Sequence, residues 1–272
     1  MKRKFKRMIQ FIVRPIKPFL KSRSATIRSG PAKGLKGMVG QWTIPFQDEM
    51  EDDFLRKLNF NGKMVYDVGA NVGAVTLFLG KNVGEAGRVF AFEPHPHIVK
   101  SLHQNISLNK LTNISVHEIG IGEEVGEFSL IVPVNKLGSG SIRPPDPSCE
   151  TNTYTIKVMS LDEFVSAESA PEPDFVKIDT EGFETEVLLG MPSLFKTKRP
   201  SLMLEMHGLG EDEKLKNATD VLNILFENNY AVLHLEHRQL LDGSSIELAK
   251  RGHLFACSTD DPFFDAAKDW AN

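Results

Sequence analysis

Short apolar runs alternate with amphipathic segments along most of the chain from residue 64 onward. The runs have the length and composition of buried strands, and the segments between them repeat apolar residues at helical spacing. Strands that alternate with helices indicate βαβ units and a mainly parallel sheet. The predicted strands cover 64–68, 88–93, 113–119, 174–179, 201–206, 230–235 and 254–257, and the predicted helices cover 72–81, 98–106, 183–189 and 220–228.

Two further predicted strands, 126–134 and 154–158, interrupt this alternation. They flank a loop at 138–147 that is too polar and too rich in Gly and Pro for a core. Loops of this length in compact domains are lids, binding loops or disordered segments. The pattern therefore predicts a doubly wound, Rossmann-like α/β fold with a small β insertion.

The composition is that of a globular protein, with 41% hydrophobic and 25% charged residues in a chain of 272. Collagen-like and fully disordered chains are excluded by these values. The two cysteines lie far apart, at 149 and 257, which argues against a disulfide framework or a zinc cluster. We predict a basic extension over 1–47 and one catalytic domain over 48–272.

Charge is distributed unevenly between these two parts. Residues 1–47 carry 12 Lys and Arg and no acidic residue, whereas the remainder carries 20 bases and 36 acids. An enzyme acting on nucleic acid needs a basic main surface for phosphates, so a nucleic-acid substrate is not expected. The chain contains no apolar run of about 18 residues that would span a bilayer as a helix.

The basic extension combines nine Lys and Arg in residues 1–23 with apolar residues at helical spacing. This combination is typical of an amphipathic helix lying at an anionic membrane surface. A disordered basic leader, an organelle transit peptide and a stripe packed on the protein's own body are the alternatives. We expect a cytoplasmic protein with peripheral contact to the inner face of a membrane.

A glycine-bearing turn, Asp67-Val-Gly-Ala-Asn-Val-Gly73, follows the first predicted strand. Its glycines are spaced unlike the GxGxxG of NAD enzymes, and the turn lacks the GK[ST] of a phosphate loop. Glu93 ends the second strand, where an acid hydrogen-bonds ribose hydroxyls in nucleoside-binding α/β sheets. Each feature alone fits an ordinary turn or a solvated Glu. Their order and spacing together indicate a nucleoside cofactor.

Four segments resemble the FkbM family of S-adenosylmethionine-dependent methyltransferases: Val65–Gly73, Ala91–Pro94, Ser160–Phe164 and Phe175–Glu184. The resemblance extends from about residue 48 to 207 and implies a mainly parallel, seven-stranded sheet with an antiparallel closing strand. It also implies S-adenosyl-L-methionine as cofactor. The implied binding residues are Asp67, Gly69, Asn71 and Gly73 for the methionine half, Glu93 for the ribose, and Glu118 and Ile119 for the adenine.

Two pairs of polar residues flank the ends of the fourth and fifth predicted strands. Asp179 and Glu181 follow one strand, and Glu205 and His207 follow the other. Residues i and i+2 of an extended strand point to one face, so each pair is expected to converge on one pocket. We predict that these four residues act as base and orienters. Three carboxylates and a His also suit a divalent metal.

The predicted reaction is O-methylation of a hydroxyl on a sugar, glycolipid or polyketide-like small molecule, including a lipid-linked glycan. A carboxylate or an amine acceptor is the alternative within the same family. An NAD-dependent Rossmann oxidoreductase is disfavoured by the glycine spacing and by the lack of a Tyr-x-x-x-Lys pair. A non-catalytic scaffold with the methyltransferase fold is the third possibility.

Overall fold

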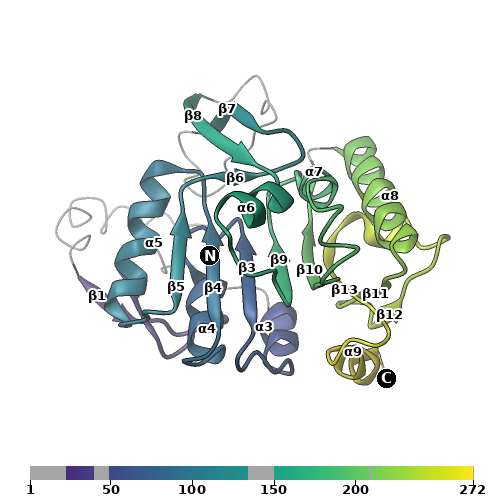
Figure 1. Cartoon of the computed structure of the whole chain (residues 1–272), viewed down its shortest axis with the longest axis horizontal. Helices are drawn as coiled ribbons and strands as arrows, with labels where there is room; N and C mark the ends of the chain where they lie inside the picture. The colour runs from purple at the N-terminus through teal and green to yellow at the C-terminus, as the bar shows by residue number, and fades with distance from the viewer. Residues whose placement is uncertain (1–22, 40–48, 134–149, 209, 272) are drawn as a thin grey trace, which may run out of the picture.

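The structure is a computed structural model that describes residues 23–39, 49–133, 150–208 and 210–271 (Figure 1). The loop 138–147 lies outside these residues, and so does the helix expected within 1–23, except for residue 23. Both stay predictions. Within the described ranges, no helix combines the length and the apolar composition needed to cross a membrane.

The main sheet of the described chain has eight strands in the order β12-β11-β13-β10-β9-β3-β4-β5. Strands β13 and β12 run opposite to the other six, so that each pairs antiparallel with the strands beside it. The seven predicted strands are all present, but β12 extends the edge by two residues, so the expected count of seven is one too few. The bounds are β3 (Met64–Val68), β4 (Arg88–Phe92), β5 (Ile114–His117), β9 (Phe175–Ile178), β10 (Ser201–Met206), β11 (Ala231–His234), β12 (Gln239–Leu240) and β13 (Gly252–Cys257).

Helices cover both faces of this sheet (Figure 1). One face packs against α3, α4, α5 and α9, and the other packs against α6, α7 and α8. The helix bounds are α3 (Glu49–Leu55), α4 (Ala74–Asn82), α5 (Pro96–Leu108), α6 (Leu161–Ala167), α7 (Glu184–Leu189), α8 (Glu211–Glu227) and α9 (Phe264–Ala271), with a short 3-10 helix at Leu248–Lys250.

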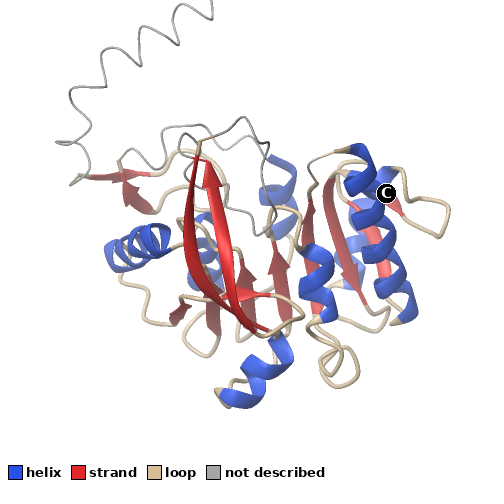
Figure 2. Ribbon diagram, turned by 90° about the horizontal axis from the view of Figure 1, so that it is seen from above, coloured by secondary structure: helices blue, strands red, loops and turns tan. Residues whose placement is uncertain are grey.

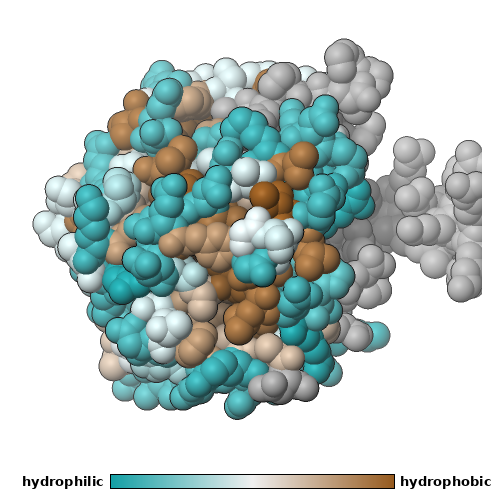
Figure 3. All heavy atoms as spheres, turned by 90° about the vertical axis from the view of Figure 1, so that its right-hand side faces the viewer, coloured by the Kyte–Doolittle hydropathy of each residue, from teal (hydrophilic) through white to brown (hydrophobic). Residues whose placement is uncertain are grey.

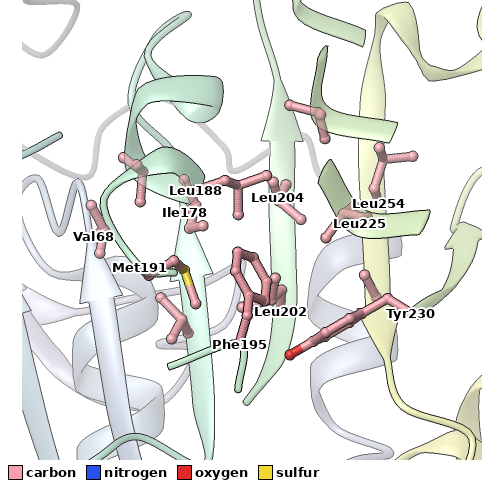
Figure 4. Packing of buried hydrophobic residues seen from close by; sticks show 14 of the residues in the cluster. Val68, Ile178, Leu188, Met191, Phe195, Leu202, Leu204, Leu225, Tyr230 and Leu254 are labelled. Carbon is pink, nitrogen blue, oxygen red and sulfur yellow. The ribbon is translucent and has the colours of Figure 1, made fainter. Parts of the chain in front are cut away.

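Strand β10 shows how side-chain alternation builds two cores from one strand. Leu202 and Leu204 point into the cluster with Leu225 and Tyr230 (Figure 4). Met203 points the other way, into the cluster that contains Phe54 of α3. Successive side chains of a strand face opposite sides of the sheet, so a run of apolar residues is buried on both.

A second, smaller sheet has the order β6-β8-β7 and comprises Gly120–Ile121, Thr151–Met159 and Gly126–Pro133 respectively. It contains the two strands of the predicted insertion and adds β6, which the sequence pattern did not indicate. The antiparallel pair of β7 and β8 lies over the carboxyl ends of the central strands of the main sheet (Figures 1 and 2). The insertion therefore stands where ligands bind in α/β sheets.

Helix α8 begins at Glu211, nine residues before the predicted start. Its first turn is Glu211, Asp212 and Glu213, which favours a helix N-terminus electrostatically but contributes no apolar periodicity. The short helices α3, α6 and α9 and the two strands β1 (Ser24–Thr26) and β2 (Lys36–Met38) were also not predicted. Elements this short hold too few apolar positions to establish a period.

The side of the molecule that carries α8 and α9 includes the outer edge of the main sheet. Figure 3 shows this side, with apolar residues gathered near its middle and hydrophilic residues around them. Leu215 of α8 and Leu240 of β12 are among the exposed apolar residues, with 39% and 46% of their surface accessible to solvent. This side lies away from the carboxyl ends of β3 and β4.

Gly69 allows the turn after β3 to touch the chain that follows β9. Its φ of 83° lies in the left-handed region. A Cβ added at Gly69 would lie 1.8 Å from the carbonyl oxygen of Asp179. No side chain fits in that space, so the close approach of the two segments requires glycine.

We expect Gly69→Ala to lower the free energy of unfolding by about 2–4 kcal/mol, because the methyl group forces the two segments apart and φ is unfavourable. Gly62→Ala is a matched control, since Gly62 has a φ of 76° but nothing within 4 Å of an added Cβ. The control should lose only about 1–2 kcal/mol. Urea denaturation measures both, and equal losses would contradict the steric explanation.

Candidate active site

A pocket that opens to solvent lies at the carboxyl ends of β3, β4 and β9, where ligands bind in open α/β sheets. The second sheet forms part of the wall. The lining residues are Val68, Gly69, Asn71, Phe92, Glu93, Pro94, His95, Ile98, Ile119, Gly120, Ile121, Leu130, Asp179, Thr180, Glu181 and Phe183.

The glycine turn forms one wall of the pocket. Gly69 and Asn71 line it, and both have positive φ, 83° and 51°. The backbone N–H of Asn71 donates to Glu93 Oε2 at 2.9 Å, which joins the turn to the end of β4. Gly73 has a φ of 98° and starts α4, but it lies outside the lining.

Asp67 lies below the turn and does not line the pocket, although we predicted that it would hold the cofactor. Its side chain is buried, and its Oδ2 accepts a hydrogen bond from Thr76 Oγ1 at 2.5 Å. Burial raises its pKa, and the ammonium of Lys177 opposes that change. Side chains alternate between the two faces along β3, so that of Asp67 points toward α4 and away from the pocket. Asp67 therefore supports the glycine turn from below.

The two residues predicted to border the adenine are separated by the structure. Ile119 lines the pocket, whereas Glu118 is exposed and lies outside the lining. Both follow β5, where the chain leaves the main sheet to enter β6. The apolar member of the pair is therefore the one that faces the pocket.

Glu93 is held by backbone groups at the end of β4. Its Oε1 accepts from the N–H of His95 at 2.8 Å, and its Oε2 accepts from Asn71. The side chain is buried, and burial raises its pKa to about 7, with the carboxylates of Asp179 and Asp67 adding to the effect. The two hydrogen bonds act in the opposite direction because they stabilise the ionised form.

His95 lines the pocket and was not predicted from the sequence. Its Nδ1 accepts a hydrogen bond from the N–H of His97, which caps α5. The neutral ring then carries its proton on Nε2, which is buried and has no hydrogen-bond partner among the residues that the structure describes. Burial lowers the pKa of His95, so the ring stays neutral. A His directly before Pro96 at a helix start was the available sequence signal.

Asp179 follows β9 and lines the pocket. Its Oδ2 accepts from the Nζ of Lys177 at 2.9 Å, and Lys177 also faces Glu51 of α3 at 3.9 Å. Burial alone would raise the pKa of Asp179, but Lys177 and then His207 hold it below its usual range. Lys177, although part of the family-like segment, was not predicted as a site residue.

Glu205 and His207 lie close to Asp179, but neither of them lines the pocket itself. His207 Nε2 lies 3.3 Å from Glu205 Oε1 and 4.0 Å from Asp179 Oδ1. Burial lowers the pKa of His207, but hydrogen bonds to Glu184 and Glu205 and the charge of Asp179 raise it to about 11. The three side chains are between 22% and 32% exposed, so their polar tips are open to solvent.

Glu181 lines the same pocket as Asp179, but for a different reason from the one predicted. Strand β9 ends at Ile178, and Glu181 has a φ of 53°, so strand alternation does not apply to it. The residue is exposed and lies outside the group formed by Asp179, Glu205 and His207.

Glu184 is a buried anchor that sequence reasoning missed. Its carboxylate accepts from the N–H of Gly182 at 3.0 Å and from Asn217 Nδ2 of α8 at 2.8 Å, and it lies 3.3 Å from His207 Nδ1. The side chain has no exposed surface. The available signal was an acid at the first position of α7, three residues after Glu181.

The chain was compared with known proteins. The model of the methyltransferase FkbM domain matches residues 67–239. Hexuronic acid methyltransferase AglP of Haloferax volcanii is 28% identical over 224 residues, which cover 78% of this chain and 86% of the relative. Methyltransferase 1 of Beauveria bassiana is 23% identical over 144 residues, 47% of this chain and 57% of the relative.

Among solved structures, the crystal structure of methyltransferase FkbM from Methylobacillus flagellatus KT is 20% identical, with a TM-score of 0.48. The similarity covers 74% of this chain and 44% of that one, so the chain spans less than half of that structure's length. The domain match, by contrast, extends over more than half of this chain, from the glycine turn to β12. The chain therefore belongs to the FkbM methyltransferase family.

Proposed function

We propose that the protein transfers a methyl group from S-adenosylmethionine to an oxygen atom of a sugar. The observation that carries the acceptor class is the 28% identity to hexuronic acid methyltransferase AglP, which extends over most of both chains. The match to a methyltransferase family disfavours the NAD-dependent oxidoreductase considered from the sequence. A non-catalytic scaffold is an outcome that the experiments below distinguish.

Four features of the pocket fit S-adenosylmethionine. Gly69 and Asn71 bring main-chain groups of the glycine turn to the wall of the pocket. Glu93 presents a carboxylate suited to a ribose diol. His95 lies in the wall of the same pocket and has a buried N–H that no other described residue accepts, and buried donors are normally satisfied. Asp179 adds a negative charge that favours a sulfonium.

The bound cofactor supplies an activated methyl group, so the chain's own task is to orient the acceptor and manage its proton. Holding two reacting atoms in line contributes several kcal/mol. A hydroxyl acceptor must also lose a proton as its oxygen bonds to the methyl carbon and the carbon–sulfur bond breaks. We assign Glu181 as the proton acceptor, because its exposed carboxylate lines the pocket. Asp179, Glu205 and His207 orient the acceptor.

We expect S-adenosylhomocysteine to bind the full chain with one site in calorimetry, whereas NAD should not bind. The glycine turn and Glu93 supply the contacts for a nucleoside, and the turn lacks the glycine spacing used for a pyrophosphate. Binding of NAD alone would support the oxidoreductase. Failure to bind either ligand would support the non-catalytic scaffold.

Cofactor affinity should depend on pH through Glu93. Its pKa of about 7 means that the carboxylate takes up a proton as the pH falls below neutrality and then loses an acceptor for the ribose hydroxyls. Affinity for S-adenosylhomocysteine should fall on the order of 20-fold between pH 7.5 and pH 5.5. Glu93→Gln should bind weakly at pH 7.5 and show little further change.

Glu51→Gln is the control for this measurement. Burial also raises the pKa of Glu51 to about 7, but Glu51 lies outside the pocket lining. This variant should keep the pH dependence of the wild type. A wild-type affinity that stays constant from pH 7.5 to pH 5.5 would show that Glu93 does not carry the ribose contact.

Methyl transfer should be detected with labelled S-adenosylmethionine and oligosaccharides that contain a hexuronic acid. A methyl ether formed at a hydroxyl resists mild alkali, whereas a methyl ester formed at a carboxylate is hydrolysed. We expect an ether, and we expect Glu181→Gln to lower turnover by about 100-fold or more because no group then takes the hydroxyl proton. Cofactor affinity should change by only a few-fold.

Asp212→Asn is the matched control, since Asp212 is an exposed acid at the start of α8, outside the pocket lining. An alkali-labile product would show that the acceptor is a carboxylate, which has no proton to lose. Glu181→Gln should then retain its turnover. Full turnover of Glu181→Gln on an ether-forming acceptor would refute its assignment as the proton acceptor.

A further inference from the structure

Three ligand-type atoms surround one point beside the cofactor pocket. Asp179, Glu205 and His207 each offer one such atom, and these atoms all lie within 4.8 Å of one another. His207 Nε2 lies 3.3 Å from Glu205 Oε1 and 4.0 Å from Asp179 Oδ1. Ligands bound at about 2.1 Å are separated by about 3.0 Å when adjacent in an octahedron and about 4.2 Å when opposite. The three atoms thus already have separations near those of ligands around a single cation.

The imidazole of His207 is oriented by a buried group on its far side. Its Nδ1 lies 3.3 Å from Glu184 Oε1, and Glu184 is itself held by Asn217 Nδ2 at 2.8 Å. A histidine that binds a metal through one nitrogen almost always donates its other N–H to a carboxylate or carbonyl. His207 therefore has the outer partner of a metal ligand and turns Nε2 toward Asp179 and Glu205.

Each of the two carboxylates has a buried basic side chain beside its second oxygen, but only one of them is hydrogen-bonded there. Asp179 Oδ2 accepts from the Nζ of Lys177 at 2.9 Å. Glu205 Oε2 lies 3.8 Å from His253 Nε2 of β13, which is beyond hydrogen-bond distance. Lys177 and His253 are buried, with side-chain exposures of 5% and 2%, whereas the tips of Asp179, Glu205 and His207 are open to solvent. A cation can reach the point without a rearrangement of the core.

A protonated His207 alone accounts for only part of this arrangement. At 3.3 Å its Nε2–H can reach Glu205, but 4.0 Å to Asp179 Oδ1 is too long for a hydrogen bond. A divalent cation between the three atoms would contact all of them and would balance the two carboxylates. Cation binding would replace the proton on Nε2, since a metal-bound imidazole is neutral.

We propose that Asp179, Glu205 and His207 bind one divalent first-row cation, of which Mn²⁺ and Zn²⁺ suit two carboxylates and an imidazole. Three protein ligands leave coordination positions open at the edge of the pocket. Oxygen atoms of the sugar acceptor would occupy these open positions. Binding of the acceptor by the cation rests on the proposed methyl transfer, whereas binding of the cation does not. In this proposal, the three side chains orient the acceptor through the bound ion.

Binding is tested on the metal-free full chain by titration with Mn²⁺, followed by the electron paramagnetic resonance signal of the free ion. We expect one Mn²⁺ per chain. Glu205→Gln and His207→Gln should each weaken binding by about tenfold or more, because each removes one of three ligands. Asp212→Asn removes an exposed acid of a different cluster and should bind as the wild type does. Thermal melting verifies that each variant folds.

A second measurement needs no variant. Electron spin-echo modulation of the bound Mn²⁺ should show coupling to one imidazole nitrogen, and Zn²⁺ should displace the ion. Mn²⁺ that stays free at millimolar concentration, or that binds without nitrogen coupling, would overturn the proposal and leave His207 as an imidazolium only. Calorimetry with S-adenosylhomocysteine on the same sample separates the two ideas: cofactor binding without a Mn²⁺ site refutes the metal proposal alone, and Mn²⁺ binding without cofactor binding refutes the proposed function alone.

Discussion

A buried ammonium group is the constraint around which the candidate site is organised. Lys177 lies in the middle of the main sheet, where a lone charge would cost several kcal/mol. Asp179 on the same strand, Asp67 on the neighbouring strand and Glu51 of α3 face it, and together they outweigh burial and raise its pKa above the ordinary value. The partners come from three separate elements, so pairing one cation requires β3, β9 and α3 to assemble in one arrangement.

Glu184 has the complementary role of a buried anion that organises its surroundings. It is a buried carboxylate whose partners are a turn N–H, an amide of α8 and the ring of His207. Fixed charges in the interior thus orient polar side chains whose tips reach solvent. This arrangement suits methyl transfer, in which the methyl group is already activated and the protein contributes mainly by holding the reacting atoms in place.

The sequence predicted strands β3 and β10 at their observed bounds, because each is a compact apolar run between polar segments. Alternation along a strand also placed Glu205 and His207 together. The same rule failed for Glu181, since its backbone is left-handed and the strand had already ended. Glu51 and Lys177, like Glu184 and Asn217, are distant in sequence, and periodicity carries no information about such pairs. The start of α8 was missed because its first turn is acidic rather than apolar.

The contact between Gly69 and the carbonyl of Asp179 has a consequence for how relatives of this protein can diverge. Because two main-chain segments meet there without intervening side chains, their spacing is a property of the backbone and is insensitive to most substitutions. The methyl donor and the carboxylate of Asp179 would thus keep the same relative position while residues of the β7–β8 insertion are substituted. New acceptor specificities can then arise by changes in the insertion alone, and the distance between the methyl donor and the acceptor site would stay the same.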